Sequence, residues 1–343
     1  TCTFNLDTYE WLAIIKNTTG AVEKWYWIDS LRGENKYISS DATTAETTDA
    51  NVLTVSGTTF TLGSTLGAKN YLCEFHKAGL AADTASNEEG SLNTTATSAN
   101  TVSGFAISTY TGTGSNATCG HGLTSAPEFI AIKDISTGSA GWINYHIGMG
   151  GTKFIKFDTA QAAQTLATVF QDTNPSATLI TMGTANSINT NEKLHVSYAW
   201  HGVEGYSSFG SYEGNANVDG SFIATNMFSA SSFFKNIDAG VDWIASGKAY
   251  NPHNPTDQVL QLAATTALVT ATAHDVVSTG IKMRSTDPAV NTAHTFIYGA
   301  WGGRALTDGA INQGRAGAVK PYDQAYGGNT IKRVGNFWVH TFT

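Results

Sequence analysis

Carboxylate pairs are the first residues to test for chemistry in this chain, because hydrolysis of a glycosidic bond needs two carboxyl groups about 5 to 9.5 Å apart. Glu88 and Glu89 are adjacent in a polar stretch and would point in different directions. Glu192, Glu204 and Glu213 fall at expected turns. The pattern places no two acids on one face of one strand, so a catalytic acid pair is not predicted.

Histidines and loop motifs give no firmer sign of catalysis. His195 and His201 are separated along an expected strand by roughly 20 Å, too far to share a metal ion. Residues 112–120 are rich in glycine, but they lie in an expected hairpin and not before a helix, whose N-terminus a phosphate site requires. The sequence contains no HExxH, GxSxG or P-loop motif. We therefore expect a protein that is not an enzyme.

Aromatic residues give a sharper choice between two roles. Trp25, Trp27, Trp142 and Tyr145 are candidate ligand-binding residues, because the flat face of an exposed ring stacks on a sugar. The alternative is that the recurring tryptophans are core residues between two sheets. Trp25, Tyr26 and Trp27 are consecutive and must face both sides of a strand, so at least one is expected outside or at an interface.

Composition narrows the class of protein. Charged residues make up 13% of the chain, against about 25% in an average globular protein. The net charge of −8 argues against binding to nucleic acid or to anionic lipid. No stretch approaches 18 uninterrupted apolar residues, so no membrane insertion is expected. The odd count of cysteines (Cys2, Cys73 and Cys119) predicts neither a disulfide framework nor a zinc site.

Three copies of one unit are visible along the chain. Residues 10–30, 128–146 and 232–246 each carry an apolar run with a lysine, then a glycine turn, then a tryptophan. Trp142 and Trp243 are 101 residues apart, and so are Trp200 and Trp301. We align Phe75 with Trp200 as the corresponding position of the first copy, and we interpret residues 81–101 as a linker.

Within each copy, short alternating segments rich in Val, Ile, Thr and aromatic residues predict strands with one buried face. The fold class is therefore all-β, with tandem jelly-roll-like antiparallel β-sandwich domains. We expect sandwich units over residues 1–103, 104–206 and 207–305, and a C-terminal extension over 306–343. Residues 159–170 are expected to form a short helix or a loop over one sheet face.

The two ends of the chain differ from this plan. A strand and hairpin (residues 104–114 and 208–220) lead into the second and third units, but only nine residues precede Glu10. We expect that the chain begins inside a unit, and that the missing edge strand lies upstream or comes from another part of the assembly. The basic C-terminal extension ends in an aromatic strand, Phe337 to Phe342, that could exchange onto a neighbour's open edge.

These motifs resemble a family of repeated jelly-roll domains in structural proteins of tailed bacteriophages, similar to the laminin-G and concanavalin-A type of sandwich. The resemblance covers most of residues 10–305 and rests on segments at 104–114, 121–123, 127–133, 142–146 and 198–200. It implies a place on the virion exterior, other virion proteins as partners, and a homo-oligomer.

Calcium is a further expectation from this resemblance, since laminin-G-like sandwiches often hold Ca²⁺ at a rim. Asn215, Asn217 and Asp219 offer oxygen atoms at alternate positions of one turn, and oxygen is the ligand that Ca²⁺ prefers. The alternative is a plain polar hairpin, because Asn, Asp and Gly are also ordinary turn residues.

The leading functional hypothesis is a non-enzymatic virion protein in a tail fibre or other external appendage, with contact to a host surface glycan. Tandem sandwiches would form a long rod whose repeated weak sites give avidity. A capsid decoration or cement protein is the first alternative. A glycan-cleaving depolymerase is the second, and it would need the acid pair that the sequence does not reveal.

Overall fold

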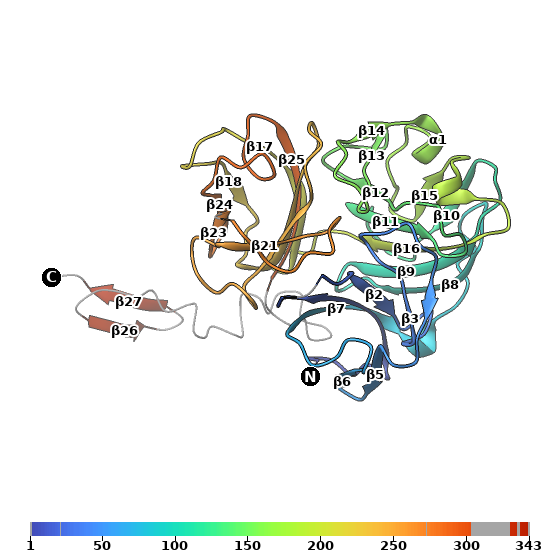
Figure 1. Cartoon of the computed structure of the whole chain (residues 1–343), viewed down its shortest axis with the longest axis horizontal. Helices are drawn as coiled ribbons and strands as arrows, with labels where there is room; N and C mark the ends of the chain where they lie inside the picture. The colour runs from blue at the N-terminus through green and yellow to red at the C-terminus, as the bar shows by residue number, and fades with distance from the viewer. Residues whose placement is uncertain (1, 21, 272, 303–329, 335–336, 342–343) are drawn as a thin grey trace.

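The computed structural model describes residues 2–20, 22–271, 273–302, 330–334 and 337–341 and confirms an all-β protein (Figure 1). Most of the C-terminal extension, including Arg304, Arg315 and Lys320, lies outside the described residues. Antiparallel strands form every larger sheet. This agrees with the alternating Val, Ile, Thr and aromatic pattern, which suits a pleated surface.

The strands fall into three units that follow the order of the chain. Unit one contains β1 (Tyr9–Asn17), β2 (Tyr26–Asp29), β3 (Lys36–Tyr37), β4 (Thr47–Thr48), β5 (Leu53–Ser56), β6 (Thr59–Leu62), β7 (Tyr71–Leu80) and the 3-10 turn η1 (Ala81–Asp83). Unit two contains β8 (Thr94–Asn100), β9 (Phe105–Thr111), β10 (Ala117–Gly120), β11 (Phe129–Asp134), β12 (Ile143–His146), β13 (Lys153–Phe154), β14 (Gln164–Thr165), α1 (Ala167–Phe170), β15 (Leu179–Met182), α2 (Asn186–Asn189) and β16 (Leu194–Trp200).

Unit three contains β17 (Ser207–Glu213), β18 (Phe222–Ala224), β19 (Ser229–Asn236), β20 (Ile244–Gly247), β21 (Gln258–Gln261), β22 (Val269–Thr270), β23 (His274–Val277), β24 (Gly280–Met283) and β25 (Thr295–Gly302). Beyond it, β26 (Thr330–Val334) and β27 (Phe337–Thr341) pair with each other as an antiparallel hairpin.

Each unit is built on the same core of three strands. The orders β2-β1-β7, β12-β11-β16 and β20-β19-β25 correspond to one another. In the register of these sheets His76, Trp200 and Trp301 occupy equivalent places, opposite Leu12, Phe129 and Ser231 respectively. The alignment of Phe75 with Trp200 is therefore wrong by one residue, because the histidine stands where the other units have tryptophan.

Two expected boundaries are corrected by the sheet topology. β8 pairs with β9 in the five-stranded sheet of unit two, so residues 94–100 belong to unit two and not to residues 1–103 as a first domain. Residues 81–101 are thus a turn and a strand and not a linker. Residues 159–170, expected to form a short helix or a loop, are irregular apart from the short strand β14 and the single helical turn α1.

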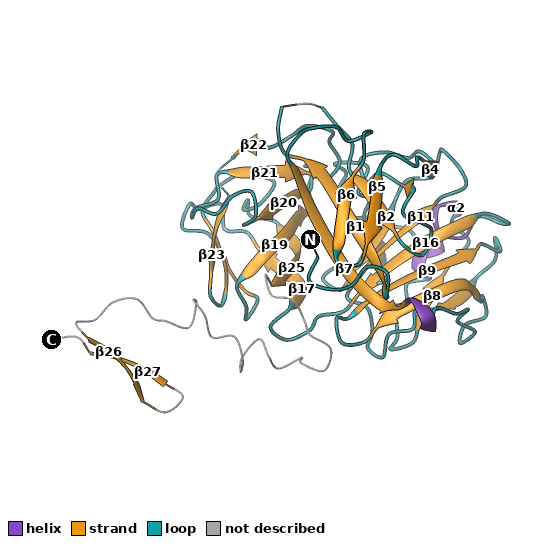
Figure 2. Ribbon diagram, turned by 90° about the horizontal axis from the view of Figure 1, so that it is seen from below, coloured by secondary structure: helices purple, strands orange, loops and turns teal. Residues whose placement is uncertain are grey.

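Both faces of the three-strand sheets are covered by packing, although residues 71–75 of β7 are only half-buried. One face of each sheet packs into its own unit, and the other packs on a shared core to which all units contribute, including Trp27, Trp142 and Trp243. Figures 1 and 2 show the three units gathered into one body. The expected rod of separate sandwiches is therefore wrong for this chain: the units share a core and close on one another.

Candidate functional site

Three equivalent lysines link the units in a ring. Lys16, Lys133 and Lys235 lie on β1, β11 and β19, and all are fully buried. Each Nζ donates to a carbonyl of its own unit and to one of a neighbour. The bonds between units join Lys16 to Ala264 O at 3.2 Å, Lys133 to Thr43 O at 2.9 Å and Lys235 to Ala160 O at 3.0 Å. Unit one thus bonds unit three, unit two bonds unit one, and unit three bonds unit two.

Three recurring tryptophans form hydrogen bonds between the units in the same cyclic order as the lysines. The indole nitrogens of Trp25, Trp142 and Trp243 donate to Gln261 O at 2.9 Å, Ser39 O at 2.7 Å and Lys156 O at 2.7 Å. These acceptors belong to units three, one and two, in the same cyclic order. Each tryptophan therefore satisfies its only donor across a unit boundary while its ring fills the shared core.

Burial shifts the pKa values of the three lysines toward neutral pH. It lowers the pKa of Lys16, Lys133 and Lys235 to about 8, and nearby carboxylates such as Asp41, Asp158 and Asp242 oppose the change. A low-pKa lysine is often a catalytic sign. Here each ammonium is saturated by backbone carbonyls and faces no cavity described below, so the ring is structural.

The four candidate ligand-binding residues are not available as an exposed platform. Trp25 and Trp27 are 2% exposed, Tyr145 is 1% exposed and Trp142 is fully buried. Trp27 and Trp142 lie 5.0 Å apart between ring centroids in the shared core, whereas Tyr145 packs inside unit two. Their rings leave no face for a sugar. The expectation that one of Trp25, Tyr26 and Trp27 lies at an interface is confirmed, because the shared core is that interface.

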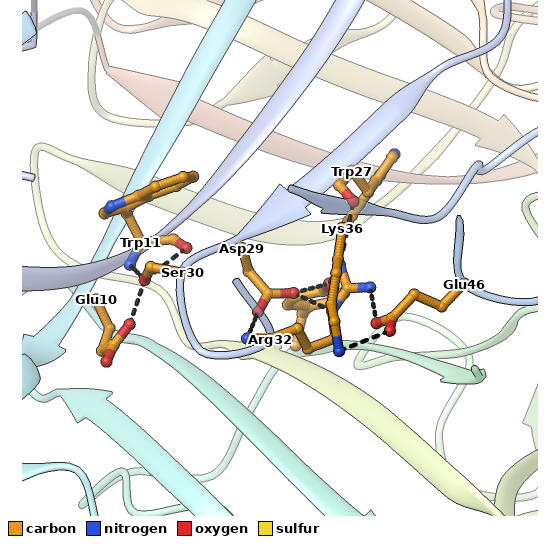
Figure 3. Close-up of polar contacts among 9 residues, drawn as sticks. Glu10, Trp11, Trp27, Asp29, Ser30, Arg32, Lys36 and Glu46 are labelled. Carbon is orange, nitrogen blue, oxygen red and sulfur yellow. Dashed lines mark hydrogen bonds and ion pairs between the residues drawn. The ribbon is translucent and has the colours of Figure 1, made fainter. Parts of the chain in front are cut away.

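A buried ion-pair network in unit one, whose Asp29, Arg32 and Glu46 are drawn in Figure 3, also reaches unit two. Arg32 Nε lies 2.5 Å from Asp29 Oδ2, and Arg32 Nη1 lies 2.9 Å from Glu46 Oε2. Tyr198 of unit two donates to the same Asp29 oxygen at 2.6 Å. Every charge is hydrogen-bonded, which is the condition for a buried pair to be tolerated. The network positions β2 against β16 and leaves no group free for chemistry.

An acid and a histidine line a cavity of about 300 Å³ beside β7. Glu74 Oε1 lies 3.4 Å from His76 Nε2, and Ser231 of unit three donates to Glu74 Oε2 at 2.9 Å. Burial raises the pKa of Glu74 to about 7, against the hydrogen bond from Ser231, and burial lowers the pKa of His76 to about 3. The pair is therefore poised to hold one proton near neutral pH, on the carboxyl group.

The remainder of this cavity, which we call the β7 cavity, is formed by three units. Lys77 and Phe75 come from β7, Val102 and Ser103 from the turn between β8 and β9, and Trp301 from β25. The sequence analysis missed the site, although a signal exists. Glu74 occupies the register position of Tyr198 and Gly299 in the other units, so an acid stands where the repeats place uncharged residues.

A second cavity, of about 280 Å³, carries two glutamates. Glu128 and Glu204 both line it, next to Gly205 and Asn226. Glu128 Oε2 accepts the amide of Gly202 at 2.9 Å. Sequence reasoning placed Glu204 at a turn and did not connect it with Glu128, because the two residues lie on opposite ends of the β11–β16 segment. This cavity is the place where an enzymatic alternative can be tested.

The candidate calcium turn is closed by its own hydrogen bonds. Asn215 Oδ1 accepts the amide of Asn217, and Asn217 Oδ1 accepts the amide of Asp219. The Asp219 carboxylate lies 3.0 Å from Lys282 and 3.2 Å from Arg284, which lower the pKa of Asp219. These oxygens serve a turn and an ion pair. Among the described residues, no three His, Cys, Asp or Glu side chains gather as a metal site requires.

Histidines of unit two make structural contacts, and the candidate His201 bonds Gly202 O through Nδ1 at 2.9 Å. Tyr110 stacks on His195 at 5.1 Å, and His146 bonds Tyr298 O at 3.0 Å across units two and three. His121 bonds Ser176 O within unit two. None of the helices in the described part of the chain has the length and apolar character that crossing a bilayer demands.

Comparisons with known proteins identify a family without a known role. The model of a family described as "Domain of unknown function (DUF7483)" matches residues 8–304, which is nearly all of the three-unit body. No curated protein matches the chain, and no solved structure matches it. The match crosses all three units as one domain, in agreement with their shared core.

Proposed function

This chain belongs to the DUF7483 family, a domain of unknown function, and we propose that it is a non-enzymatic structural protein of a bacteriophage virion. The carrying observation is the closed ring of bonds between units. Lysines, tryptophans and ion pairs that resemble functional groups in the sequence are used to lock three units into one rigid body. A protein whose buried polar groups bond other parts of the same chain is suited to a structural role.

On the virion we place the protein outside, in a tail fibre or another appendage. The resemblance to jelly-roll domains of phage structural proteins supports this location, and so does a surface that relies on Thr, Ser and Asn more than on charge. Contact with a host glycan would have to use groups other than Trp25, Trp27, Trp142 and Tyr145, which are buried.

A capsid decoration protein is the second candidate, and the compact body favours it. A rod presents many surfaces along its length, whereas three units around one core present a short block (Figures 1 and 2). Such a block suits a fixed place on a shell as well as the tip or joint of a fibre.

The deciding experiment is a cryo-EM reconstruction of intact particles in which the three-unit body is fitted to density. Density on tails or fibres supports the appendage, and density repeated over the shell supports decoration. Particles that lack the protein in both places, checked by mass spectrometry of purified virions, would refute the virion proposal.

The enzymatic alternative has its own test at the second cavity. Purified protein is incubated with capsular and lipopolysaccharide glycans of candidate hosts, and reducing ends are measured. The matched variants are Glu128→Gln and Glu204→Gln. Cleavage that either variant abolishes would establish a depolymerase and overturn the structural proposal, whereas absence of cleavage by the wild-type protein agrees with it.

A further inference from the structure

β7 of unit one corresponds to β16 of unit two and β25 of unit three. Among the described residues, β7 is the only one of these three strands that pairs with a single neighbour. β16 pairs with β11 on one side and with β9 on the other, and β25 pairs likewise with β19 and β17. β7 pairs with β1 alone. The β7 cavity lies along this edge, from Leu72 to Lys77.

The partial exposure of side chains along β7 agrees with an open strand edge. Tyr71, Leu72, Cys73, Glu74 and Phe75 are all half-buried, whereas the equivalent residues of β16, from 195 to 199, are all buried. Apolar side chains left half-covered on an open strand edge favour addition of another strand.

The C-terminal hairpin has the form of the missing piece. Residues 337–343 read FWVHTFT, and residues 105–111, which include β9, read FAISTYT. Phenylalanine and two threonines are identical, while Val339 replaces Ile107 and Phe342 replaces Tyr110. The hairpins also pair alike: Val334 lies opposite Phe337 in one, and Asn100 lies opposite Phe105 in the other.

We infer that β27 adds to the open edge of β7 in the same chain and completes the sheet of unit one. The order becomes β1-β7-β27-β26, which repeats the order β11-β16-β9-β8 of unit two. By the registers of β16 with β9 and of β25 with β17, Phe337 comes to lie opposite His76, and His340 opposite Cys73.

The neighbourhood of β7 limits where the added strand ends. Ser103 donates to Lys77 O at 2.8 Å and Asn100 donates to Ala78 O at 3.1 Å, so the edge beyond His76 is occupied. An added strand must therefore begin opposite His76, and Phe337 is the first residue of β27. Only residues 335–336 separate β26 from β27, whereas residues 101–104 separate β8 from β9. The shorter C-terminal connection fits an edge that is open only as far as His76.

Connection favours the strand of the same chain over that of a second copy. β25 ends at Gly302, which itself lines the β7 cavity. Residues 303–329 can span on the order of 90 Å when extended, far more than this position requires. A tether of this kind gives an effective concentration in roughly the millimolar range, above that of free copies in solution.

Cysteine cross-linking of the 343-residue chain tests this inference, which does not rest on the proposed function. The variant Cys2→Ser/His340→Cys leaves Cys73 as the expected partner, because directly opposed strand residues lie close enough for a disulfide. Cys2→Ser/Val339→Cys is the matched control, since neighbouring strand positions point to opposite faces. After prolonged oxidation, non-reducing gels and peptide mass spectrometry report the linkage.

The expected result is a disulfide within the monomer between Cys73 and the thiol introduced by His340→Cys. It should be much more abundant than any linkage of Cys73 to the thiol introduced by Val339→Cys. The same bond formed between two chains would overturn the same-chain form and show exchange between copies. Equal or absent linkage in both variants would overturn the pairing itself.

Hydrogen exchange gives a second readout that needs no substitution. In the full chain, amides of residues 71–76 should exchange roughly tenfold or more slowly than in a chain ending at residue 302, while β16 peptides remain unchanged. Equal exchange of the β7 peptides in the two chains would overturn the inference.

Discussion

Unit one and unit two use the same three-strand plan, yet they treat one position differently. Tyr198 of β16 is fully buried and donates to Asp29, whereas its equivalent on β7 is Glu74, which keeps 22% of its side-chain surface exposed. Next to them, Trp200 corresponds to His76. The carboxylate stands at the position where β7 pairs with β1 alone in the described structure, whereas the tyrosine stands where β16 is paired on both sides. The difference shows that the repeats share a backbone plan, while the side chains at one register position differ in charge and in burial.

The largest expected effect tests whether the units contribute equally to the shared core. Trp142 packs against Trp27, Phe157 and Tyr198, so Trp142→Ala should lower the free energy of unfolding by about 4 kcal/mol. Trp25 contacts the Lys16 ammonium at 5.4 Å, and Trp25→Ala should cost about 3 kcal/mol. Urea denaturation followed by tryptophan fluorescence measures both. A larger loss for Trp25→Ala would contradict the view that unit one is the less closed unit.

The next effect concerns the lysine ring, where units one and two are expected to be alike. Lys133→Ala and Lys16→Ala each leave two buried carbonyls without their donor and should each cost roughly 3 kcal/mol. Since burial lowers the folded pKa to about 8 from 10.5, wild-type stability should rise with pH between those values, and each substitution should weaken that rise. Chemical denaturation from pH 7 to 10.5 measures this. A Lys16→Ala loss near zero would show that the boundary between units one and three is open.

A smaller effect isolates the acid that distinguishes unit one. The folded pKa of Glu74 is about 7 and its ordinary value is 4.5. Between these values the unfolded chain loses its proton first, so wild-type stability should fall by roughly 2 kcal/mol as pH rises from 4.5 to 7. Glu74→Gln should lack this fall. The opposite contribution of His76 is present in both proteins and cancels in the comparison. Identical pH profiles for the two proteins would refute a buried, protonated Glu74.

The smallest effect compares two tyrosines that match in units two and three. Tyr110 donates to Ile188 O at 2.7 Å and Tyr212 donates to Val290 O at 2.6 Å, both in buried surroundings. Tyr110→Phe and Tyr212→Phe should each cost about 1 kcal/mol, the value of one net hydrogen bond. Thermal unfolding is sufficient to rank them. Unequal losses would show that the two leading strands are less equivalent than their registers indicate.

The sequence supports the fold class, the number of repeats and the equivalence of Trp142 with Trp243, because these follow from strand alternation and constant spacing. It does not reveal that the second face of each sheet is buried. A strand covered on both sides, such as β11 with all of its residues buried, still contains the polar pair Lys133 and Asp134, which local pattern assigns to solvent.

The burial of the candidate ligand-binding residues was harder to predict, because it depends on contacts between units. Trp25, Trp27 and Trp142 lie in the shared core, and only the contacts between distant units decide that these rings are buried. Glu74 and His76 stand out only when the strand registers of the three units are compared. The one-residue misalignment of Phe75 with Trp200 concealed that comparison.

The direction of the ring of bonds has a consequence for biosynthesis. Unit one is made before units two and three, but Lys16 and Trp25 donate to Ala264 and Gln261, which are made more than two hundred residues later. Until then the Trp25 indole has no acceptor, and the Lys16 ammonium has only the carbonyl of Glu23 in its own unit. Domains usually fold one by one from the N-terminus; here unit one, although it is made before units two and three, completes its bonds only after unit three has been made.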